Sequence, residues 1–559
     1  MGALTRNPLV WILLAAAGLR LAGLAWGLPA SDGWDDDGFA PRNFLTALAL
    51  TWKHGAYFTY PPLQALLMAI LTLPAILLAL LHAPSLHQAD VIGEFIKPGY
   101  MTFFAVMGRF VSLAMSLAIV WILGEMTRSV AGRRAGLFAA AASALHFGLT
   151  YYGQVSNLDV PYLFWALLGL LFCIRGAMAQ KTKSFLGAAL CAAASVATKD
   201  QAYGLYVLSV PLFLLLWFGL DAWPRGQVRQ LLLSLLAYSA AAMVLLLLVD
   251  GAITNPSGFL RRIAFLTGPA SKDYAEYLAG PVGWLALLGD MGRYFLQGAG
   301  VVAVPLAFLG FALQLTRSRG SALAASLLPA LAIISFTLCF NFAALRSDDR
   351  FLMPQSLLAC VYIGIAADAL AYAAQDWARF LGRCVLAAVA LVSLHHAIAI
   401  DAAMLFDPRY EAQTWLGAYA RPGDVIETYG QNCFLPHFPQ GARVTRIGDG
   451  DLKRRNPLPD VIEIRQPFGT PRNPRFIVVS TAWAWRYLRP QMVLPPGHIY
   501  SALQQADFRN RDGRDFFSRL VNRRLGYRLA LVAKYRGLWP LVHIHDSLDE
   551  AVWIFERSS

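Results

Sequence analysis

The sequence predicts a polytopic α-helical membrane protein of about eleven spans, followed by a C-terminal extracytoplasmic α/β domain. Of 559 residues, 57% are hydrophobic and only 14% are charged. This composition is too apolar for an ordinary soluble enzyme. Apolar runs such as Gln230 to Val249 recur along the chain, and about 20 such residues in a helix match a ~30 Å hydrocarbon core.

The first apolar run, Pro8 to Leu28, contains Arg20 and is followed by no clear small-residue cleavage site. We therefore expect a retained helix rather than a cleaved signal peptide. The net charge of +13 could indicate nucleic-acid binding. In a membrane protein, however, basic loops that alternate along the chain are explained by the positive-inside rule. We expect no nucleic-acid partner. The loops assigned to the cytoplasm are Arg128 to Arg134, Lys181 to Lys183, Arg225 to Arg229, Arg317 to Arg319 and Arg379 to Arg383.

The second apolar run, Pro62 to Leu81, is predicted to dip into or lie along the outer leaflet. If it were a simple span, the loop at Arg133 and Arg134 would fall outside and every later loop would invert. A long external loop, about residues 31–102, results. A second external loop, about residues 251–296, contains Arg261 and Arg262 and is expected to form an interfacial helix that acts as a lid.

The membrane region is predicted to cover residues 1–404 in a prokaryotic plasma (inner) membrane, with the active site on the extracytoplasmic side. The predicted spans lie near residues 8–29, 103–124, 135–152, 158–178, 184–199, 201–221, 230–250, 297–315, 321–343, 351–373 and 384–404.

After Asp401 the composition becomes that of a soluble protein, so residues 405–559 are predicted to form a separate domain. A helix is expected over Tyr410 to Tyr419. Short buried strands are expected over Asp424 to Tyr429, Arg475 to Ser480, Arg528 to Lys534 and Ala551 to Phe555. Acceptor recognition and a cap that stabilises the external loops are both open as roles. Five of the six cysteines lie in apolar runs, and no disulfide framework is expected.

Three consecutive carboxylates, Asp35, Asp36 and Asp37, follow the first span. Like charges this close raise the proton affinity of at least one member, which suits a general base or a cation site. The alternative is a solvated loop whose flanking aromatic residues anchor at the interface.

A further acid, Asp159, lies where one span emerges on the same face and the next begins. Asp159 is predicted to be catalytic together with the Asp cluster. The residues predicted to contact substrate are its neighbours Gln154 and Asn157, with Tyr60, Arg109, Lys199, Asp200 and Arg350. The alternative is N-capping, in which Asn157 or Asp159 accepts the unpaired amides of the following helix.

Cations lie on that face too, in Lys199-Asp200 and at Arg350, with Arg109 as a weaker case. Charges near hydrocarbon are costly and usually have a partner or a function. As alternatives, Lys199 pairs with Asp200 or extends its ammonium to the membrane surface. Arg350 likewise has the alternative of pairing with Asp348 or Asp349. Carboxylates and fixed cations in a membrane-surface cleft suit a lipid-linked sugar phosphate, with a carboxylate as base and the cations on the departing phosphate.

The order of these motifs resembles the GT-C superfamily of lipid-carrier-dependent glycosyltransferases, especially the protein O-mannosyltransferase and aminoarabinose transferase branch. The resemblance covers about residues 8–404. The matching elements are Asp35-Asp36-Asp37, Tyr60-Pro61-Pro62-Leu63, Arg109-Phe110-Val111-Ser112-Leu113, Gly132-Arg133-Arg134, Asp159, Thr198-Lys199 and Arg350 to Pro354.

The resemblance implies a membrane glycosyltransferase with a polyprenyl or dolichyl phosphate sugar donor and a lipid, glycan or protein acceptor. One Asp of the triplet would be the base in an inverting displacement, and Lys199 and Arg350 would contact the carrier phosphate. The family usually has Asp-Glu where this chain has the Asp triplet, and Tyr60 stands where one branch has Lys. Carboxylates suit a divalent cation as well as a metal-free base. The rival class is a multi-spanning secondary transporter with an external domain.

Overall fold

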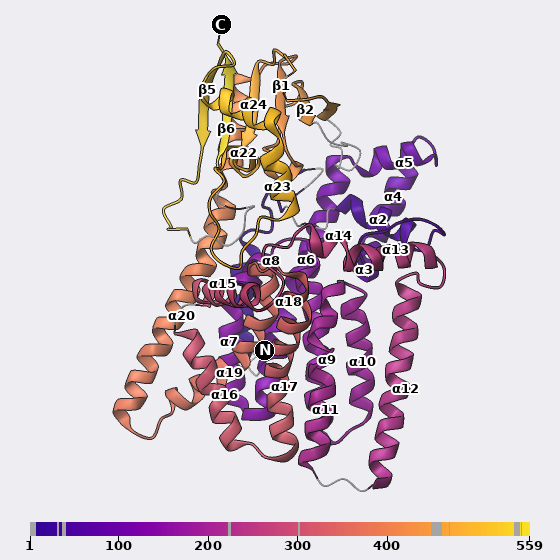
Figure 1. Cartoon of the computed structure of the whole chain (residues 1–559), viewed down its shortest axis with the longest axis vertical. Helices are drawn as coiled ribbons and strands as arrows, with labels where there is room; N and C mark the ends of the chain where they lie inside the picture. Colours follow the sequence, from indigo (N-terminus) through magenta and orange to yellow (C-terminus); the bar gives the residue numbers. More distant parts are fainter. Residues whose placement is uncertain are drawn as a thin grey trace.

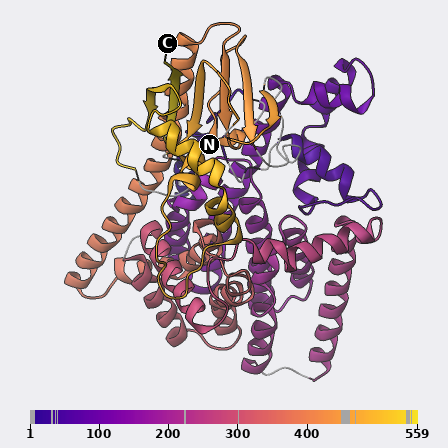
Figure 2. The same ribbon diagram turned by 45° about the horizontal axis from the view of Figure 1, so that its top comes forward.

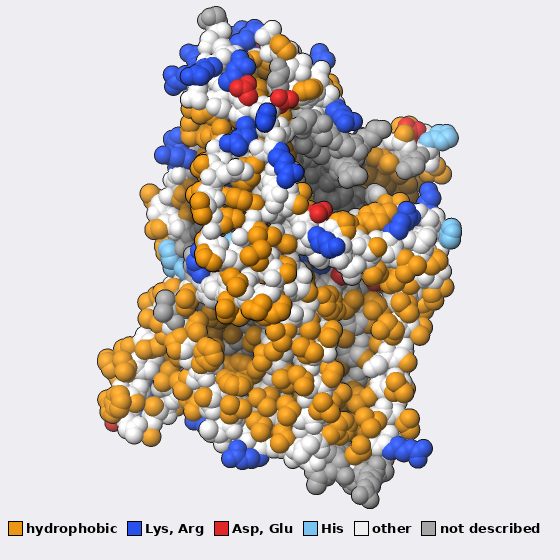
Figure 3. Space-filling model, in the orientation of Figure 1, with side chains coloured by type: hydrophobic (Ala, Val, Ile, Leu, Met, Phe, Trp, Pro, Cys, Tyr) orange, Lys and Arg blue, Asp and Glu red, His pale blue; other side chains and the backbone are white. Residues whose placement is uncertain are grey.

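The computed structural model describes residues 7–30, 33–35, 38, 41–221, 225–299, 302–448, 461–468, 470–541, 548 and 550–558. A bundle of long helices forms one part and a mixed sheet with helices on both faces forms the other (Figure 1). Hydrophobic side chains cover the lower half of the molecule, and Lys and Arg gather at its two ends (Figure 3). This is the surface of a protein whose bundle lies in lipid.

The bundle helices follow the predicted apolar runs, some as long helices and some as short helical pieces. They are α1 (Pro8–Leu21), α6 (Pro98–Ala131), α7 (Arg133–Ala144), α8 (Phe147–Tyr152), α9 (Asp159–Ala179), α10 (Lys183–Val196), η1 (Asp200–Leu205), α11 (Ser209–Leu220), α12 (Arg225–Val249), α16 (Ala303–Arg317), α17 (Gly320–Phe336), η2 (Thr337–Asn341), α18 (Phe342–Ala344), α19 (Asp349–Ala371) and α20 (Asp376–Leu405).

Among the described residues, seven helical segments are long and apolar enough to cross a membrane, or eight if a bent pair counts as one. Three predicted spans correspond to the shorter apolar helices α1, α10 and α16. The predicted span 135–152 is divided into α7 and α8 instead. Arg20 lies beside the break, and its guanidinium donates to the carbonyls of Ala144 (3.0 Å) and Leu149 (3.2 Å) on either side of it. The count of eleven stays a prediction.

The run Pro62 to Leu81 forms two helices, α3 (Leu63–Leu71) and α4 (Leu73–His82), which are bent by 70° at Thr72. The bend agrees with the expectation that this run is no simple span. With α2 (Pro41–Thr51) and α5 (Gln88–Phe95) it lies at the end of the bundle that carries the sheet (Figure 1).

The second long loop also forms helices at that end: α13 (Pro256–Thr267), α14 (Pro269–Lys272) and α15 (Pro281–Ala299) (Figure 1). Asn255 is fully buried and fastens this loop to the first one. Its amide nitrogen donates to the carbonyl of Ala56 (2.9 Å), and its amide oxygen accepts from the backbone N–H of Gly55 (3.0 Å).

The C-terminal sheet has the order β3-β2-β1-β4-β6-β5. Strands β1 (Val425–Tyr429), β2 (Arg443–Gly448), β3 (Val461–Arg465) and β4 (Phe476–Ser480) are parallel, whereas β5 (Tyr527–Ala533) and β6 (Val552–Arg557) are antiparallel additions. Four of these six strands and the helix α21 (Pro408–Tyr419) match the sequence prediction.

Residues of alternating strand positions face opposite sides of the sheet, as the period of two requires. One face packs against α22 (Thr481–Leu488) and α24 (Arg511–Val521), and the other packs against α21. The remaining short helices are η3 (Asn432–Phe434) and α23 (Ala502–Arg509). Figure 2 shows the strands at the top of the molecule, with the C-terminal helices in front of them.

Candidate active site

Asp35 lies in the loop after α1, at the end of the bundle that carries the sheet. It is 9% exposed, and its Oδ1 accepts a hydrogen bond from the Tyr151 hydroxyl of α8 at 3.1 Å. Arg109 of α6 lies within electrostatic range of both residues and donates to the Leu24 carbonyl at 2.6 Å. The carboxylate is therefore held between two helices. Asp36 and Asp37 lie outside the described residues.

Asp159 is the first residue of α9 and is 1% exposed. Its Oδ1 pairs with Lys199 Nζ at 2.6 Å and lies 3.4 Å from Gln201 Nε2. Of the two residues that could cap α9, Asn157 does so: its side-chain oxygen accepts a hydrogen bond from the backbone N–H of Asp159 at 2.9 Å. The Asp159 carboxylate therefore does not cap the helix but binds the Lys199 ammonium. This contact puts Asp159 on the cationic side of the site. Its catalytic role stays a prediction.

One alternative paired Lys199 with Asp200. In the structure Asp200 pairs instead with Arg262 of α13. The Arg262 side chain is fully buried, lies 3.4 Å from Asp250 Oδ2 and stacks over the Phe58 ring at 5.2 Å. This ion pair anchors α13 beside the Lys199 turn. Sequence reasoning placed Arg262 only in a loop, because nothing in its local pattern shows a buried partner 62 residues away.

Arg350 lies in the first turn of α19, and its guanidinium is 3.6 Å from Asp348 Oδ2. Asp348 caps α19 by accepting the Phe351 backbone N–H at 3.0 Å. The buried Tyr162 of α9 lies within electrostatic range of both Arg350 and Asp159. The ends of α9 and α19 thus bring Arg350 near the Asp159–Lys199 pair.

The Tyr60-Pro61-Pro62-Leu63 element meets the same turn. The Leu63 backbone N–H donates to the Ala197 carbonyl at 3.0 Å, which places the start of α3 directly before Thr198-Lys199. Tyr60 is 48% exposed. The segment that follows Tyr60 thus contacts the Lys199 turn.

Gln154 is fully buried and hydrogen bonds within the protein. Its amide nitrogen donates to Asp401 Oδ1 at 2.9 Å, and its amide oxygen accepts the Gly23 backbone N–H at 2.5 Å. These contacts join α1, α8 and α20. The predicted substrate contacts of Gln154 and Asn157 stay predictions.

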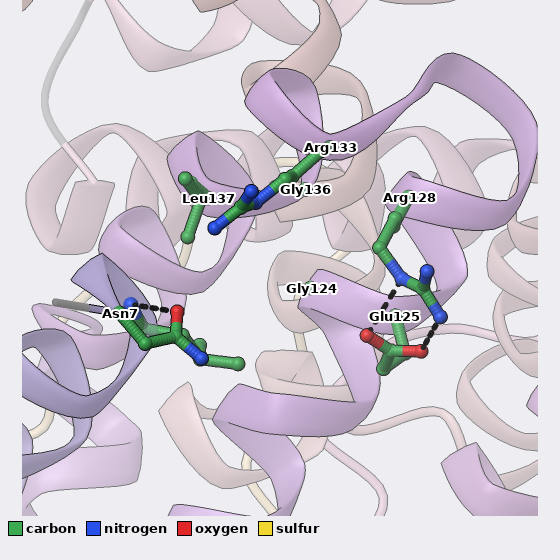
Figure 4. Close-up of a pocket in the computed structure, with 8 residues that line it drawn as sticks. Asn7, Gly124, Glu125, Arg128, Arg133, Gly136 and Leu137 are labelled. Carbon is green, nitrogen blue, oxygen red and sulfur yellow. Dashed lines mark hydrogen bonds and ion pairs between the residues drawn. The ribbon is translucent and has the colours of Figure 1, made fainter. Parts of the chain in front are cut away.

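Two cavities are lined by other residues. One of about 240 Å³ lies at the opposite end of the bundle, where Glu125 binds Arg128 and where Asn7 and Arg133 also line the cavity (Figure 4). Another of about 490 Å³ lies along α21 between Tyr410, Trp415 and Leu531. Among the described residues, no group of three or more His, Cys, Asp or Glu side chains is placed to hold a metal ion.

No family model matches the sequence, and no curated protein sequence matches it. Several solved structures are similar. ArnT from Cupriavidus metallidurans in the apo state is 14% identical with a TM-score of 0.48, over 87% of this chain and 96% of that chain. The same protein bound to undecaprenyl phosphate is 12% identical with a TM-score of 0.48, over 97% and 98%.

The archaeal oligosaccharyltransferase AglB from Archaeoglobus fulgidus, in complex with an inhibitory peptide and a dolichol-phosphate, is 13% identical with a TM-score of 0.45, over 98% of this chain and 88% of that chain. Both proteins are members of the GT-C superfamily that the sequence motifs resemble. At these identities and scores the likeness is distant.

Proposed function

We propose that this chain is an integral-membrane glycosyltransferase that moves a sugar from a polyprenyl or dolichyl phosphate carrier to an acceptor outside the cytoplasm. One observation carries the proposal. A buried carboxylate, Asp35, and two cations, Lys199 and Arg350, come from distant segments to the same end of the helical bundle. Charges so close to hydrocarbon are costly and indicate function.

The cationic side suits the donor. Lys199 and Arg350 bind the carrier phosphate, and the polyprenyl tail extends into the bilayer along the apolar bundle. The Asp159 carboxylate, 2.6 Å from Lys199 Nζ, holds this ammonium in place. Fixed cations stabilise the negative charge that develops on the departing phosphate.

The acidic side suits the acceptor. A carboxylate of the Asp35 cluster removes the proton from the acceptor nucleophile as that nucleophile attacks the anomeric carbon. A bond forms between acceptor and sugar, the bond between sugar and phosphate oxygen breaks, and polyprenyl phosphate leaves. Attack opposite the leaving group inverts the anomeric configuration. The acceptor class is a lipid, glycan or protein of the cell envelope.

The test uses the full chain in nanodiscs with a panel of polyprenyl-phosphate sugars. We expect release of polyprenyl phosphate, measured by mass spectrometry, and a fall in kcat of about 10²- to 10⁴-fold for Asp35→Asn, the usual range for loss of a general base. Asp90→Asn, on α5 and paired with Ser85, is the matched control and should keep the wild-type rate.

Two results would count against the proposal. Wild-type activity after replacement of Asp35, Asp36 and Asp37 together by Asn would remove the proposed base. Movement of a solute across sealed vesicles with no bond cleaved would instead favour the secondary transporter.

A further inference from the structure

The loop that carries Asp35 is packed against the C-terminal domain through its neighbour Trp34. The Trp34 side chain is 1% exposed. Its ring lies 4.8 Å from the Tyr410 ring and 5.2 Å from the His437 ring, measured between centroids. The backbone N–H of Gly27 donates to the Tyr410 hydroxyl at 3.0 Å. Residues on both sides of the loop are thus fixed by residues that follow the last bundle helix.

Arg409 stands at the centre of this contact and is 5% exposed. Its guanidinium binds Asp407 through two contacts, Nη2 to Oδ2 at 2.6 Å and Nε to Oδ1 at 2.8 Å. It also donates to the carbonyls of Trp34 (3.4 Å) and Cys433 and lies 4.4 Å above the Trp34 ring. A planar guanidinium can bind a carboxylate through two nitrogens, donate to backbone carbonyls and stack on an aromatic ring at the same time. A Lys ammonium cannot make all of these contacts.

Asp407 connects the same arrangement to the turn that follows α1. Its Oδ2 accepts a hydrogen bond from Trp26 Nε1 at 2.8 Å, and the carboxylate is 3% exposed. One buried ion pair therefore contacts the loop at Trp26 and Trp34, on either side of its turn. Charged groups this deeply buried remain only where hydrogen bonds compensate their desolvation.

We propose that Arg409 is a positioning residue for the Asp35 carboxylate, and that the C-terminal domain acts through it as a clamp on the catalytic loop. The clamp is defined as Asp407, Arg409, Tyr410 and His437. This inference rests on the proposed function. It gives the C-terminal domain a part in catalysis through contacts that do not touch the acceptor.

The physical basis is the stretch between α1 and Asp35. Residues 22–30 and 33–35 form turns and bends, not a helix or strand that would fix the carboxylate by itself. Asp35 is instead located by Tyr151 on one side and by Trp34, its chain neighbour, on the other. A displacement of about 1 Å at a reacting group can cost about 10²-fold in rate. Loss of the clamp should therefore lower kcat.

A second contact of the C-terminal domain serves as a contrast. His498 Nε2 lies 2.9 Å from Asp290 Oδ2 of α15, and Tyr277 donates to the same oxygen at 2.8 Å. This contact holds the other external loop and does not touch Trp34. The two loops are thus held by separate residues, and their responses can be measured separately.

The test compares Arg409→Ala, Arg409→Lys and the control Arg536→Ala in the full chain. Arg536 also belongs to the C-terminal domain and pairs with Glu411 of α21 at 2.8 Å, on an exposed side chain. Hydrogen–deuterium exchange reports on residues 22–30, and steady-state kinetics report kcat and the donor KM.

We expect exchange of residues 22–30 to be at least tenfold faster in Arg409→Ala, with kcat reduced about 10- to 100-fold and the donor KM changed less than about twofold, since Lys199 and Arg350 are untouched. Arg409→Lys should recover part of kcat, and Arg536→Ala should match the wild type. The α15 peptides should exchange as in the wild type.

Unchanged exchange of residues 22–30 in Arg409→Ala would overturn the clamp. Faster exchange throughout strands β1 and β4 would overturn it too, because Arg409 would then only maintain the fold of its domain. If the wild type releases no polyprenyl phosphate, the proposed function fails, and the exchange measurement alone decides whether Arg409 holds the loop.

Discussion

Replacing Lys199 by Met should separate the stability of the bundle from the chemistry of the site. The Lys199 ammonium lies 2.6 Å from the Asp159 carboxylate, which is 1% exposed. At that distance, with an effective dielectric constant of about 20, the attraction is roughly 6 kcal/mol before desolvation is subtracted. Removing one partner of a buried pair typically costs about 3–5 kcal/mol.

We expect the lower end of that range, about 3 kcal/mol, because the Lys199 side chain retains some exposure and solvent screens the pair. The amide groups of Asn157 and Gln201, each 3.4 Å from the carboxylate, also remain to solvate it. The matched control is Arg519→Met. Arg519 pairs with Asp515 and both side chains are exposed, and exposed pairs contribute at most about 1 kcal/mol.

The double variant Lys199→Met with Asp159→Asn carries no unpaired charge and should regain most of the lost stability. Its transfer rate should stay about 10²- to 10³-fold below wild type, because the departing phosphate has lost a fixed cation. Thermal unfolding in nanodiscs measures stability, and release of polyprenyl phosphate measures the rate. A double variant that regains both would show that Lys199 only neutralises Asp159, and a single variant as stable as wild type would refute the buried pair.

Two further predictions concern the loops. Arg262→Met leaves Asp200 and Asp250 without their shared cation and should lower the free energy of unfolding by about 3–5 kcal/mol. Thermal unfolding measures this loss. A change below about 1 kcal/mol would contradict the burial of this ion pair. Burial, and next the Arg409 charge, lower the pKa of His437. The neutral imidazole therefore stabilises the contact between the clamp and Trp34 above the unfolded pKa of about 6.5, and this stabilisation is lost as the pH falls below that value. Exchange of residues 22–30 should therefore rise between pH 7.5 and pH 5, and a His437→Asn variant with the same pH response would contradict this.

The apolar helices can be predicted from the sequence because hydrophobic length is a local property. Partners are not local. Lys199 has an Asp as its chain neighbour but pairs with Asp159, because α9 and α10 pack together and bring their ends into contact. Asp200 is then available to Arg262, which no local pattern connects to it.

The two missed strands, β2 and β3, have a similar explanation. Arg446 lies in the middle of β2 and is fully buried, because it pairs with Glu463 of the adjacent strand and with Asn432. A buried charge breaks the apolar run by which a parallel strand is recognised in a sequence. Likewise the role of Arg409 depends on Trp34, 375 residues earlier in the chain.

We propose that the end of the bundle carrying Asp35, Lys199 and Arg350 binds the lipid-carrier phosphate. A crystal or cryo-EM structure of the full chain with bound polyprenyl phosphate tests this most directly. The phosphate is predicted within about 3 Å of Lys199 Nζ and the Arg350 guanidinium, the usual distance of a charge-assisted hydrogen bond. A phosphate bound instead in the cavity of Arg128 and Arg133, at the opposite end of the bundle, would contradict the claim.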